Sequence, residues 1–375
     1  MRTAARALLV LAGLAVGLAI VELGVRVLDA RRETADLRAL HVLRPDAGWL
    51  YELRANAVAQ PAGGPRYATN SLGFRDRERA LAKPPGAFRV VAIGDSVTFG
   101  FGVELEEAWP SRLEERLRAV RPDAEVLDLG IGGYNPYTES ELLRGRGLAF
   151  APDVVLVQFC VNDLADPTIH FDHHARTRLG ALPDAAFPDP SQRTHAARGL
   201  SLLERACLAS RACSRAYDAW LARAQATLDE PTRRAGARPA DAADGPAWDW
   251  LAARYREMAR ASRASGARFA LVLFPHFEQL AGAPGSAPDP LQQRLVRLAR
   301  DEGIAAVDLL EPFRRASRAG RPPMLDYFHP DARGHAIAAQ VVAEELGRAG
   351  ILPSGGAPAA GAPAPAAASA KGEPR

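Results

Sequence analysis

Short apolar runs alternate with amphipathic stretches along much of this chain. The apolar runs are rich in β-branched and other buried-type residues, as strands inside a sheet are; they occupy residues 88–93, 125–129, 154–159, 268–274 and 305–308. Helical periodicity follows each of the earlier runs and recurs near the C-terminus, at residues 109–120, 138–150, 247–265, 289–302 and 333–348. Strands that alternate with helices predict a parallel sheet covered by helices on both faces, an α/β fold.

Four residues with possible chemical roles follow the predicted strands directly. They are Ser96, Gly133, Asn162 and His276. In open parallel sheets, functional sites lie at the carboxyl ends of the strands. We therefore expect these residues to converge at one edge of the sheet, although they are far apart in sequence.

The N-terminus contains an uncharged apolar stretch, residues 7–21, preceded by two arginines. Fifteen helical residues span only about 22 Å, whereas extension to Leu28 reaches about 33 Å, enough for a hydrocarbon core of ~30 Å. The extension contains Glu22 and Arg26, which are four apart and are expected to pair near the far end of the helix. No small-x-small cleavage site stands in the right place, so we favour an uncleaved membrane anchor over a cleaved signal peptide.

Composition divides the chain into four parts. Residues 1–30 form the anchor, and residues 31–87 form a polar, turn-rich lead-in that we expect to pack on the main domain. The main domain spans residues 88–350, and a stretch rich in Ala, Arg, Asp and Pro, residues 164–246, interrupts it as an insertion or lid. The Ala/Pro/Gly-rich tail, residues 351–375, is expected to be disordered.

Charge and cysteine content exclude several function classes. A net charge of +3, with arginines interspersed among acidic residues, argues against nucleic-acid binding. Three cysteines, Cys160, Cys207 and Cys213, make neither a zinc pattern nor a disulfide framework. Pairing of Cys207 with Cys213 is an alternative if the domain lies in an oxidising compartment, but we expect them not to pair, because a helical stretch would point them in different directions. The His170–His174 segment has three histidines but stands in a predicted polar loop without a remote ligand, so we expect no metal site there.

Two segments carry residue types that acyl transfer requires. Ser96 stands in Gly94-Asp95-Ser96 at a strand-to-helix turn, where a serine can be a nucleophile or simply a helix N-cap. Asp326 precedes His329 by three residues in a loop, so its carboxylate can hold the imidazole while the other ring nitrogen faces a serine. Asn162 adds an amide that can bind an oxyanion. Together these residues predict one hydrolytic site.

The chain resembles the SGNH (GDSL-like) esterase and acyl-hydrolase superfamily, in its membrane-tethered form. The resemblance is carried by Gly94-Asp95-Ser96, by the segment 128–133, by Asn162-Asp163 and by Asp326 with His329. It implies a flavodoxin-like three-layer α/β/α fold. It also implies Ser96 as nucleophile, His329 as base, Asp326 as its partner, and an oxyanion hole made by Ser96, Gly133 and Asn162.

Some positions leave alternatives open or depart from the family pattern. Gly132 competes with Gly133 for the oxyanion hole, because the register of the glycine run is ambiguous. Val97 replaces the leucine of the family name, and Cys160 with Val161 replaces glycines. Asp95 and His276 are candidates for substrate binding, and a structural role is an equal alternative for His276.

The resemblance implies a serine esterase that acts on an acyl ester, such as an acetylated glycan or a lipid-like ester. It would need no metal and no organic cofactor. The catalytic domain would be tethered to a membrane and face the periplasm or exterior, or be secreted if the N-terminal segment is cleaved. The alternatives are an O-acyltransferase acting on an envelope polysaccharide and a non-catalytic envelope scaffold.

Overall fold

A computed structural model describes most of the chain. It covers residues 2–32, 37–44, 46–164, 246–281 and 290–353, together with 207, 210, 212, 213, 215, 216 and 220. Most of the expected insertion at 164–246 and the expected tail from 354 onward lie outside the described residues, as does the His170–His174 segment.

A five-stranded parallel sheet forms the centre of the protein. Its strands are β5 (Phe88–Ile93), β6 (Ala124–Asp128), β7 (Val154–Phe159), β8 (Arg268–Leu273) and β9 (Ala305–Asp308). They lie in the order β6-β5-β7-β8-β9, and all four pairings are parallel. Val90, for example, pairs with Val126 on one side and Val154 on the other. The predicted strands are thereby confirmed to within one residue at their ends.

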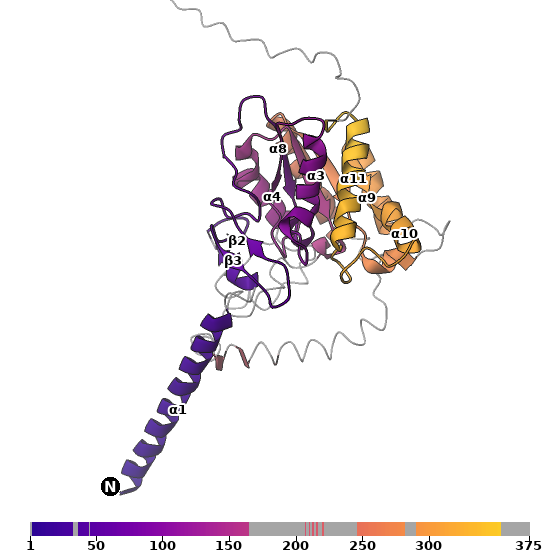
Figure 1. Ribbon diagram of the computed structural model, residues 1–375. Helices are drawn as coiled ribbons and strands as arrows, with labels where there is room; N and C mark the ends of the chain where they lie inside the picture. The colour runs from indigo at the N-terminus through magenta and orange to yellow at the C-terminus, as the bar shows by residue number, and fades with distance from the viewer. Residues whose placement is uncertain are drawn as a thin grey trace, which may run out of the picture.

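Helices cover both faces of this sheet (Figure 1). They are α3 (Trp109–Arg118), α4 (Pro136–Gly145), α8 (Pro246–Ala264), α9 (Pro290–Asp301), α10 (Leu310–Arg318) and α11 (Ala332–Arg348). Alternate strand residues face opposite layers: Val91 and Ile93 pack with α4, α8 and α9, whereas Val90 and Ala92 pack with α3, α10 and α11. This two-residue period, with apolar side chains on both faces, explains the unbroken apolar runs. The α/β/α prediction is confirmed.

One predicted helix divides into two elements. Helix α4 begins at Pro136 because Asn135 caps it, accepting hydrogen bonds from the N–H groups of Tyr137 and Thr138. It ends at Gly145, and residues 147–150 form a separate 3₁₀ turn, η3 (Gly147–Phe150). A side chain at Gly145 would meet the Trp49 ring, with its Cβ 2.2 Å from Cζ3. The expected helix 138–150 was therefore placed too far along the chain, and helix α10 was not predicted.

The lead-in packs on the main domain, as expected. It contains η1 (Leu37–Leu40) and two small antiparallel pairs, β1 (His41–Leu43) with β2 (Tyr51–Leu53) and β3 (Val58–Ala59) with β4 (Tyr67–Ala68). Tyr51 and Phe74 belong to the same apolar core as Val91 and Leu127 of the sheet. The lead-in therefore completes one face of the domain.

The guanidinium of Arg75 ties the lead-in to the loop that follows β5. The side chain is 1% exposed and donates hydrogen bonds to the carbonyl oxygens of Phe99, Gly100 and Val103 at 2.7–2.8 Å. It also lies over the Tyr67 ring, 4.4 Å from the centroid. Burial lowers the pKa of Arg75, but an arginine remains charged in proteins.

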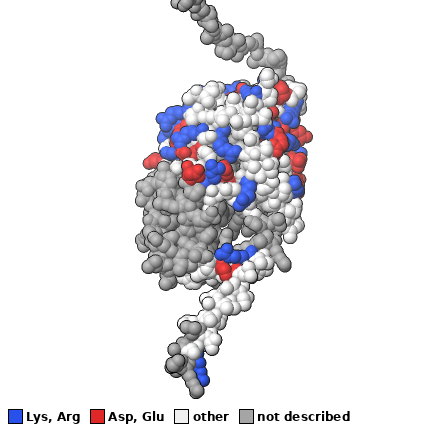
Figure 2. All heavy atoms as spheres, turned by 90° about the vertical axis from the view of Figure 1, so that its left-hand side faces the viewer, with Lys and Arg blue, Asp and Glu red and all other residues white. Residues whose placement is uncertain are grey.

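Helix α1 (Arg2–Arg32) projects from the domain as a single helix (Figure 1). Its segment Leu9–Leu28 is long and apolar enough to cross a membrane, and none of it is buried. Figure 2 shows this helix as largely white, whereas basic and acidic side chains are interspersed over the domain. Arg26 Nε lies 2.7 Å from Glu22 Oε1, which confirms the predicted pair. The helix is compatible with a membrane anchor or a signal sequence.

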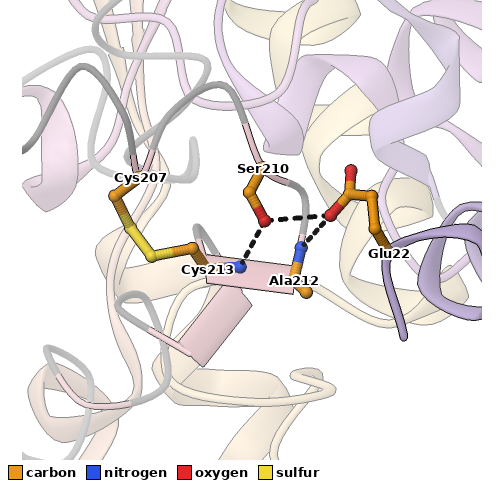
Figure 3. The surroundings of a disulfide bond; sticks show 5 residues. All are labelled: Glu22, Cys207, Ser210, Ala212 and Cys213. Carbon is orange, nitrogen blue, oxygen red and sulfur yellow. Dashed lines mark hydrogen bonds between the residues drawn. A yellow bond between two sulfur atoms is a disulfide. The ribbon is translucent and has the colours of Figure 1, made fainter. Parts of the chain in front are cut away.

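The expectation that Cys207 and Cys213 do not pair is wrong. The structure joins them in a disulfide with their Cα atoms 5.1 Å apart (Figure 3). The chain turns at Ser210, whose N–H donates to the carbonyl oxygen of Cys207 and whose hydroxyl accepts from the N–H of Cys213. That turn brings together two cysteines that a continuous helix would have separated. Glu22 of α1 accepts hydrogen bonds from the Ser210 hydroxyl and the Ala212 N–H.

Candidate active site

Ser96 stands at a tight turn between β5 and the short helix α2 (Ser96–Phe99). Gly94 makes the turn possible, because a Cβ there would lie 2.3 Å from both Gln158 Oε1 and Thr98 Oγ1. Asp95 is the N-cap and accepts a hydrogen bond from the Val97 N–H at 2.9 Å. Ser96 therefore starts the helix, and its own N–H has no acceptor within the helix.

His329 and Asp326 meet Ser96 from the other end of the chain. The Nε2 atom of His329 lies 2.9 Å from Ser96 Oγ. On the opposite side of the ring, Nδ1 lies 2.9 and 2.8 Å from the two carboxylate oxygens of Asp326. A neutral imidazole with its proton on Nδ1 donates to the carboxylate and leaves Nε2 to accept the serine proton. The predicted serine, histidine and carboxylate thus lie in one hydrogen-bonded row.

The backbone of the 324–331 loop holds this row in place. Asp326 Oδ1 accepts hydrogen bonds from the N–H groups of Phe328 and His329, each at 2.9 Å. Burial alone would raise the pKa of the Asp326 carboxyl. Hydrogen bonds from the backbone and ring of His329 and from the Phe328 N–H outweigh this effect, so the pKa of Asp326 is lowered overall. The Asp326 side chain is half-exposed, at 48%. The aspartate is therefore an ionised partner for His329 at neutral pH.

An aromatic ring lies against the imidazole. The Phe101 ring, in the loop after α2, lies 4.5 Å from the His329 ring, centroid to centroid. On the other side of this loop, Arg75 holds the carbonyl groups of Phe99 and Gly100. The lead-in thus supports the loop whose side chain touches His329.

The glycine run after β6 lies next to Ser96. A Cβ at Gly130 would lie 2.3 Å from the backbone nitrogen of Phe99, so this glycine lets the run approach α2 closely. A Cβ at Gly132 would lie 4.0 Å from Ser96 Cβ. Gly133 has φ +82°, a conformation that favours glycine. Among the described residues, no acceptor receives a hydrogen bond from the Gly133 N–H.

Asn162 follows β7 in the 3₁₀ turn η4 (Val161–Leu164). Its Nδ2 atom donates to Asp95 Oδ2 at 2.6 Å. A carboxylate accepts but cannot donate, so this contact requires the nitrogen side of the amide to face Asp95. Since Nδ2 carries two hydrogens, one remains for another acceptor. Cys160, where the family pattern has glycine, is buried, and burial raises the pKa of its thiol.

The structure also places the two candidate substrate-binding residues. Asp95 is fully buried behind Asn162, with one oxygen on the Val97 N–H and the other on the Asn162 amide. His276 follows β8, is 5% exposed, and stacks on the Tyr327 ring with centroids 5.0 Å apart. A substrate-binding role for these two residues remains a prediction.

Sequence reasoning missed a buried acidic group behind the site. Glu139 of α4 is fully buried, and its two oxygens have no hydrogen-bond partner among the described residues. Burial raises the pKa of Glu139 well above its usual value, and the nearby charges of Asp163 and Asp95 raise it further. Asp163 accepts a hydrogen bond from the Tyr255 hydroxyl at 3.1 Å, and burial raises the pKa of Asp163 in the same way. A glutamate within a helix gives no sequence signal of such burial.

The fold and the site together define a class of protein. A parallel α/β sheet that presents a serine at a strand-to-helix turn, within reach of a histidine, is the layout of an ester-bond hydrolase. Residues 92–337 match the GDSL-like Lipase/Acylhydrolase family. The chain belongs to this family and is an enzyme that hydrolyses ester bonds.

Several solved structures resemble the protein at low sequence identity. A member of the lipolytic protein G-D-S-L family from Veillonella parvula DSM 2008 is 11% identical, over 70% of this chain and 100% of that one, with a TM-score of 0.41. The acetyl xylan esterase AlAXEase is 15% identical, over 69% and 100%, with a TM-score of 0.41. A two-domain esterase (CEX) active on acetylated mannans is 18% identical, over 72% and 52%, with a TM-score of 0.38. The search of curated proteins found no match.

Proposed function

We propose that the protein is a serine esterase in which Ser96, His329 and Asp326 carry out the reaction. The observation that carries this proposal is the 2.9 Å contact between His329 Nε2 and Ser96 Oγ, with Asp326 on the other ring nitrogen. His329 takes the Ser96 proton while Oγ attacks the ester carbonyl, and Asp326 stabilises the resulting imidazolium. The protonated His329 then returns a proton to the leaving alcohol.

Three donors are available for the developing oxyanion. They are the N–H groups of Ser96 and Gly133 and the second Nδ2 hydrogen of Asn162. Support comes from the position of the glycine run beside Ser96 and from the Gly133 N–H having no other acceptor among the described residues. Water then attacks the acyl-enzyme with His329 again as base, and the acid leaves. Loss of one such donor typically costs about 10²–10³ in turnover.

The proposed substrate is an acyl ester of a glycan or lipid in the cell envelope. The apolar N-terminal helix supports a membrane location. The Cys207–Cys213 disulfide supports an oxidising compartment, where such bonds persist, and hence a periplasmic or extracytoplasmic domain. Two exposed apolar side chains are available for an apolar part of the ester. Leu325 of the 324–331 loop is 48% exposed, and Phe277, whose N–H donates to the Tyr327 carbonyl of that loop, is 46% exposed.

The test is turnover by the full chain in detergent. We would measure p-nitrophenyl esters from acetate to dodecanoate with the wild type, with Ser96→Ala, and with Ser262→Ala. Ser262 is an equally small buried hydroxyl whose hydrogen bond goes to the Met258 carbonyl within α8. We expect Ser96→Ala to lower kcat at least about 10³-fold, and Ser262→Ala to keep wild-type activity.

Retention of turnover in Ser96→Ala would exclude the proposed nucleophile. Comparing the acid formed with the p-nitrophenol released also separates hydrolysis from acyl transfer. Equal amounts identify water as the acceptor. A shortfall of acid that grows when a glycan acceptor is added would identify a transferase.

A further inference from the structure

A tyrosine from the lead-in contacts the backbone of the glycine run. The Tyr51 hydroxyl donates a hydrogen bond to the carbonyl oxygen of Gly132 at 3.2 Å, across 81 positions of sequence. Tyr51 lies on β2 and outside the part of the chain that matches the family, residues 92–337. The contact therefore joins the lead-in to the segment beside Ser96.

Because a peptide bond is planar, this contact to a carbonyl also bears on the N–H at the other end of the same peptide. The Gly132 carbonyl and the Gly133 N–H belong to one planar trans peptide, so they point in opposite directions. A donor that fixes the carbonyl therefore also fixes the direction of the N–H. Glycines flank this peptide on both sides, and their backbone torsions are the least restrained of any residue. The turn is closed by a hydrogen bond from the Tyr134 N–H to the Ile131 carbonyl oxygen at 3.1 Å. Turns with either orientation of the central peptide make this bond, so the contact to the Gly132 carbonyl selects one of the two.

Tyr51 is itself held firmly. Its side chain is fully buried, and its ring meets the Tyr134 ring edge-on with centroids 4.9 Å apart. The Tyr134 hydroxyl donates to the backbone carbonyl of Tyr51, and Tyr51 pairs with Leu43 between β2 and β1. A side chain packed in this way offers its hydroxyl to Gly132 in a fixed place.

We propose that Tyr51 is a positioning residue for the oxyanion hole, holding the Gly132–Gly133 peptide with its N–H turned to the reacting carbonyl beside Ser96. This inference rests on the proposed function. The hydrogen bond to the carbonyl also polarises the same peptide and makes its N–H a better donor. The lead-in is thereby part of the catalytic apparatus and not only a connection to α1.

The variant that tests the proposal is Tyr51→Phe, which removes only the hydroxyl. Its control is Ser71→Ala, which removes the hydroxyl of an exposed lead-in serine that donates to Glu78 Oε2 at 2.6 Å. We expect Tyr51→Phe to lower kcat about 10-fold, a part of the about 10²–10³ that a whole donor contributes, with KM unchanged. Affinity for an alkyl boronic acid, which becomes tetrahedral on Ser96, should fall by the same factor. Ser71→Ala should keep kcat within about twofold, because a surface substitution of this kind has a small effect.

A second measurement reports on the peptide without turnover. Glycine labelled with ¹³C at the carbonyl and ¹⁵N at the amide gives coupled pairs only where two glycines are consecutive, at 63–64, 132–133 and 355–356. Gly64→Ala and Gly356→Ala remove the other two signals and so assign the Gly133 amide. In the full chain in detergent, we expect Tyr51→Phe to shift the Gly133 signal and Ser71→Ala to leave it in place.

The two readouts separate this inference from the proposed function. If the wild type is as inactive as Ser96→Ala, the proposed function fails, and the Gly133 signal still decides whether Tyr51 holds the peptide. If the wild type is active but Tyr51→Phe keeps both kcat and boronate affinity, the positioning role is overturned. An unchanged Gly133 signal in Tyr51→Phe overturns it as well.

Discussion

The Nδ2 atom of Asn162 lies 2.6 Å from the Oδ2 atom of Asp95, a carboxylate with no exposed surface. This contact fixes which side of the Asn162 amide faces the site, because an amide oxygen turned toward the carboxylate would be repelled. The residue before the proposed nucleophile therefore orients the side chain that would bind the oxyanion.

Asp95→Asn tests this relationship. Asparagine caps helices about as well as aspartate, so α2 should keep its start. An amide at position 95 no longer dictates which way Asn162 turns. We expect Asp95→Asn to lower kcat by less than the about 10²–10³-fold of a lost donor and to leave the melting temperature nearly unchanged. We expect Asn162→Ala to lower kcat by the full about 10²–10³-fold. Steady-state kinetics and thermal melts of both variants measure these two quantities. An undiminished kcat in Asp95→Asn would contradict the orienting role.

Gly130→Ala should separate the glycine run from α2. The new Cβ would lie 2.3 Å from the Phe99 nitrogen and 2.6 Å from the Thr98 carbonyl carbon, and backbone atoms there must move. Overpacking of this kind costs about 1–3 kcal/mol, and a shift of about 1 Å near reacting atoms can cost 10²-fold in rate. We expect both effects in unfolding and kinetic measurements. Gly320→Ala is the control, because a Cβ at Gly320 meets nothing within 4 Å; equal effects from both variants would count against the packing argument.

Arg75→Lys should destabilise the domain although it conserves the charge. The planar guanidinium reaches three carbonyl groups that the single ammonium of lysine cannot serve together. Buried carbonyls left without a donor should lower the free energy of unfolding by about 2–4 kcal/mol. Denaturant unfolding in detergent measures this loss. Arg256→Lys, at a partly exposed ion pair with Glu302, should change stability by less than about 0.5 kcal/mol. A similarly small change in Arg75→Lys would refute the prediction.

Glu139→Gln should stabilise the protein increasingly as pH rises. Burial first, then the charges of Asp163 and Asp95, raise the pKa of Glu139 above its usual 4.5, so the folded state holds a proton that the unfolded state releases. The contribution of Glu139 to the free energy of unfolding is therefore fully present below about pH 4.5. It is lost as the pH rises through the pKa that Glu139 has in the folded state. The glutamine side chain of the variant carries no ionisable proton and escapes that loss. Melting temperatures from pH 5 to 8.5 should diverge in favour of the variant, and a pH-independent difference would rule out the mechanism.

The parts of the fold that follow from local pattern were predictable. The strand 154–159 is apolar on both faces because helices cover both sides, and its bounds were predicted to the residue. Ser96 and Asn162 could be placed together because a parallel sheet gathers the residues after its strands at one edge. His329 follows helix α10, not a strand, and was found from its spacing to Asp326 and from the family resemblance. Local periodicity could not fix the start of α4, which depends on the Asn135 cap and not on apolar spacing.

Contacts made by the tertiary fold left no trace in the sequence. Tyr51 reads as an ordinary strand tyrosine, and only the packing of the lead-in brings its hydroxyl to Gly132. Glu139 has the sequence context of a surface glutamate, yet the fold buries it completely. The Cys207–Cys213 disulfide depends on a turn at Ser210 that interrupts the helical pattern from which its absence was inferred.

The distance between α1 and the domain sets a limit on where the enzyme can work. Helix α1 ends at Arg32 and η1 begins at Leu37, so four residues join them. Even fully extended, four residues reach only about 14 Å. If α1 remains in the bilayer, as proposed, this short connection keeps the domain, and with it Ser96, close to the membrane surface. The enzyme would act only within a thin layer above the lipid headgroups. Any ester that it cleaves must therefore be brought to that layer or be formed there.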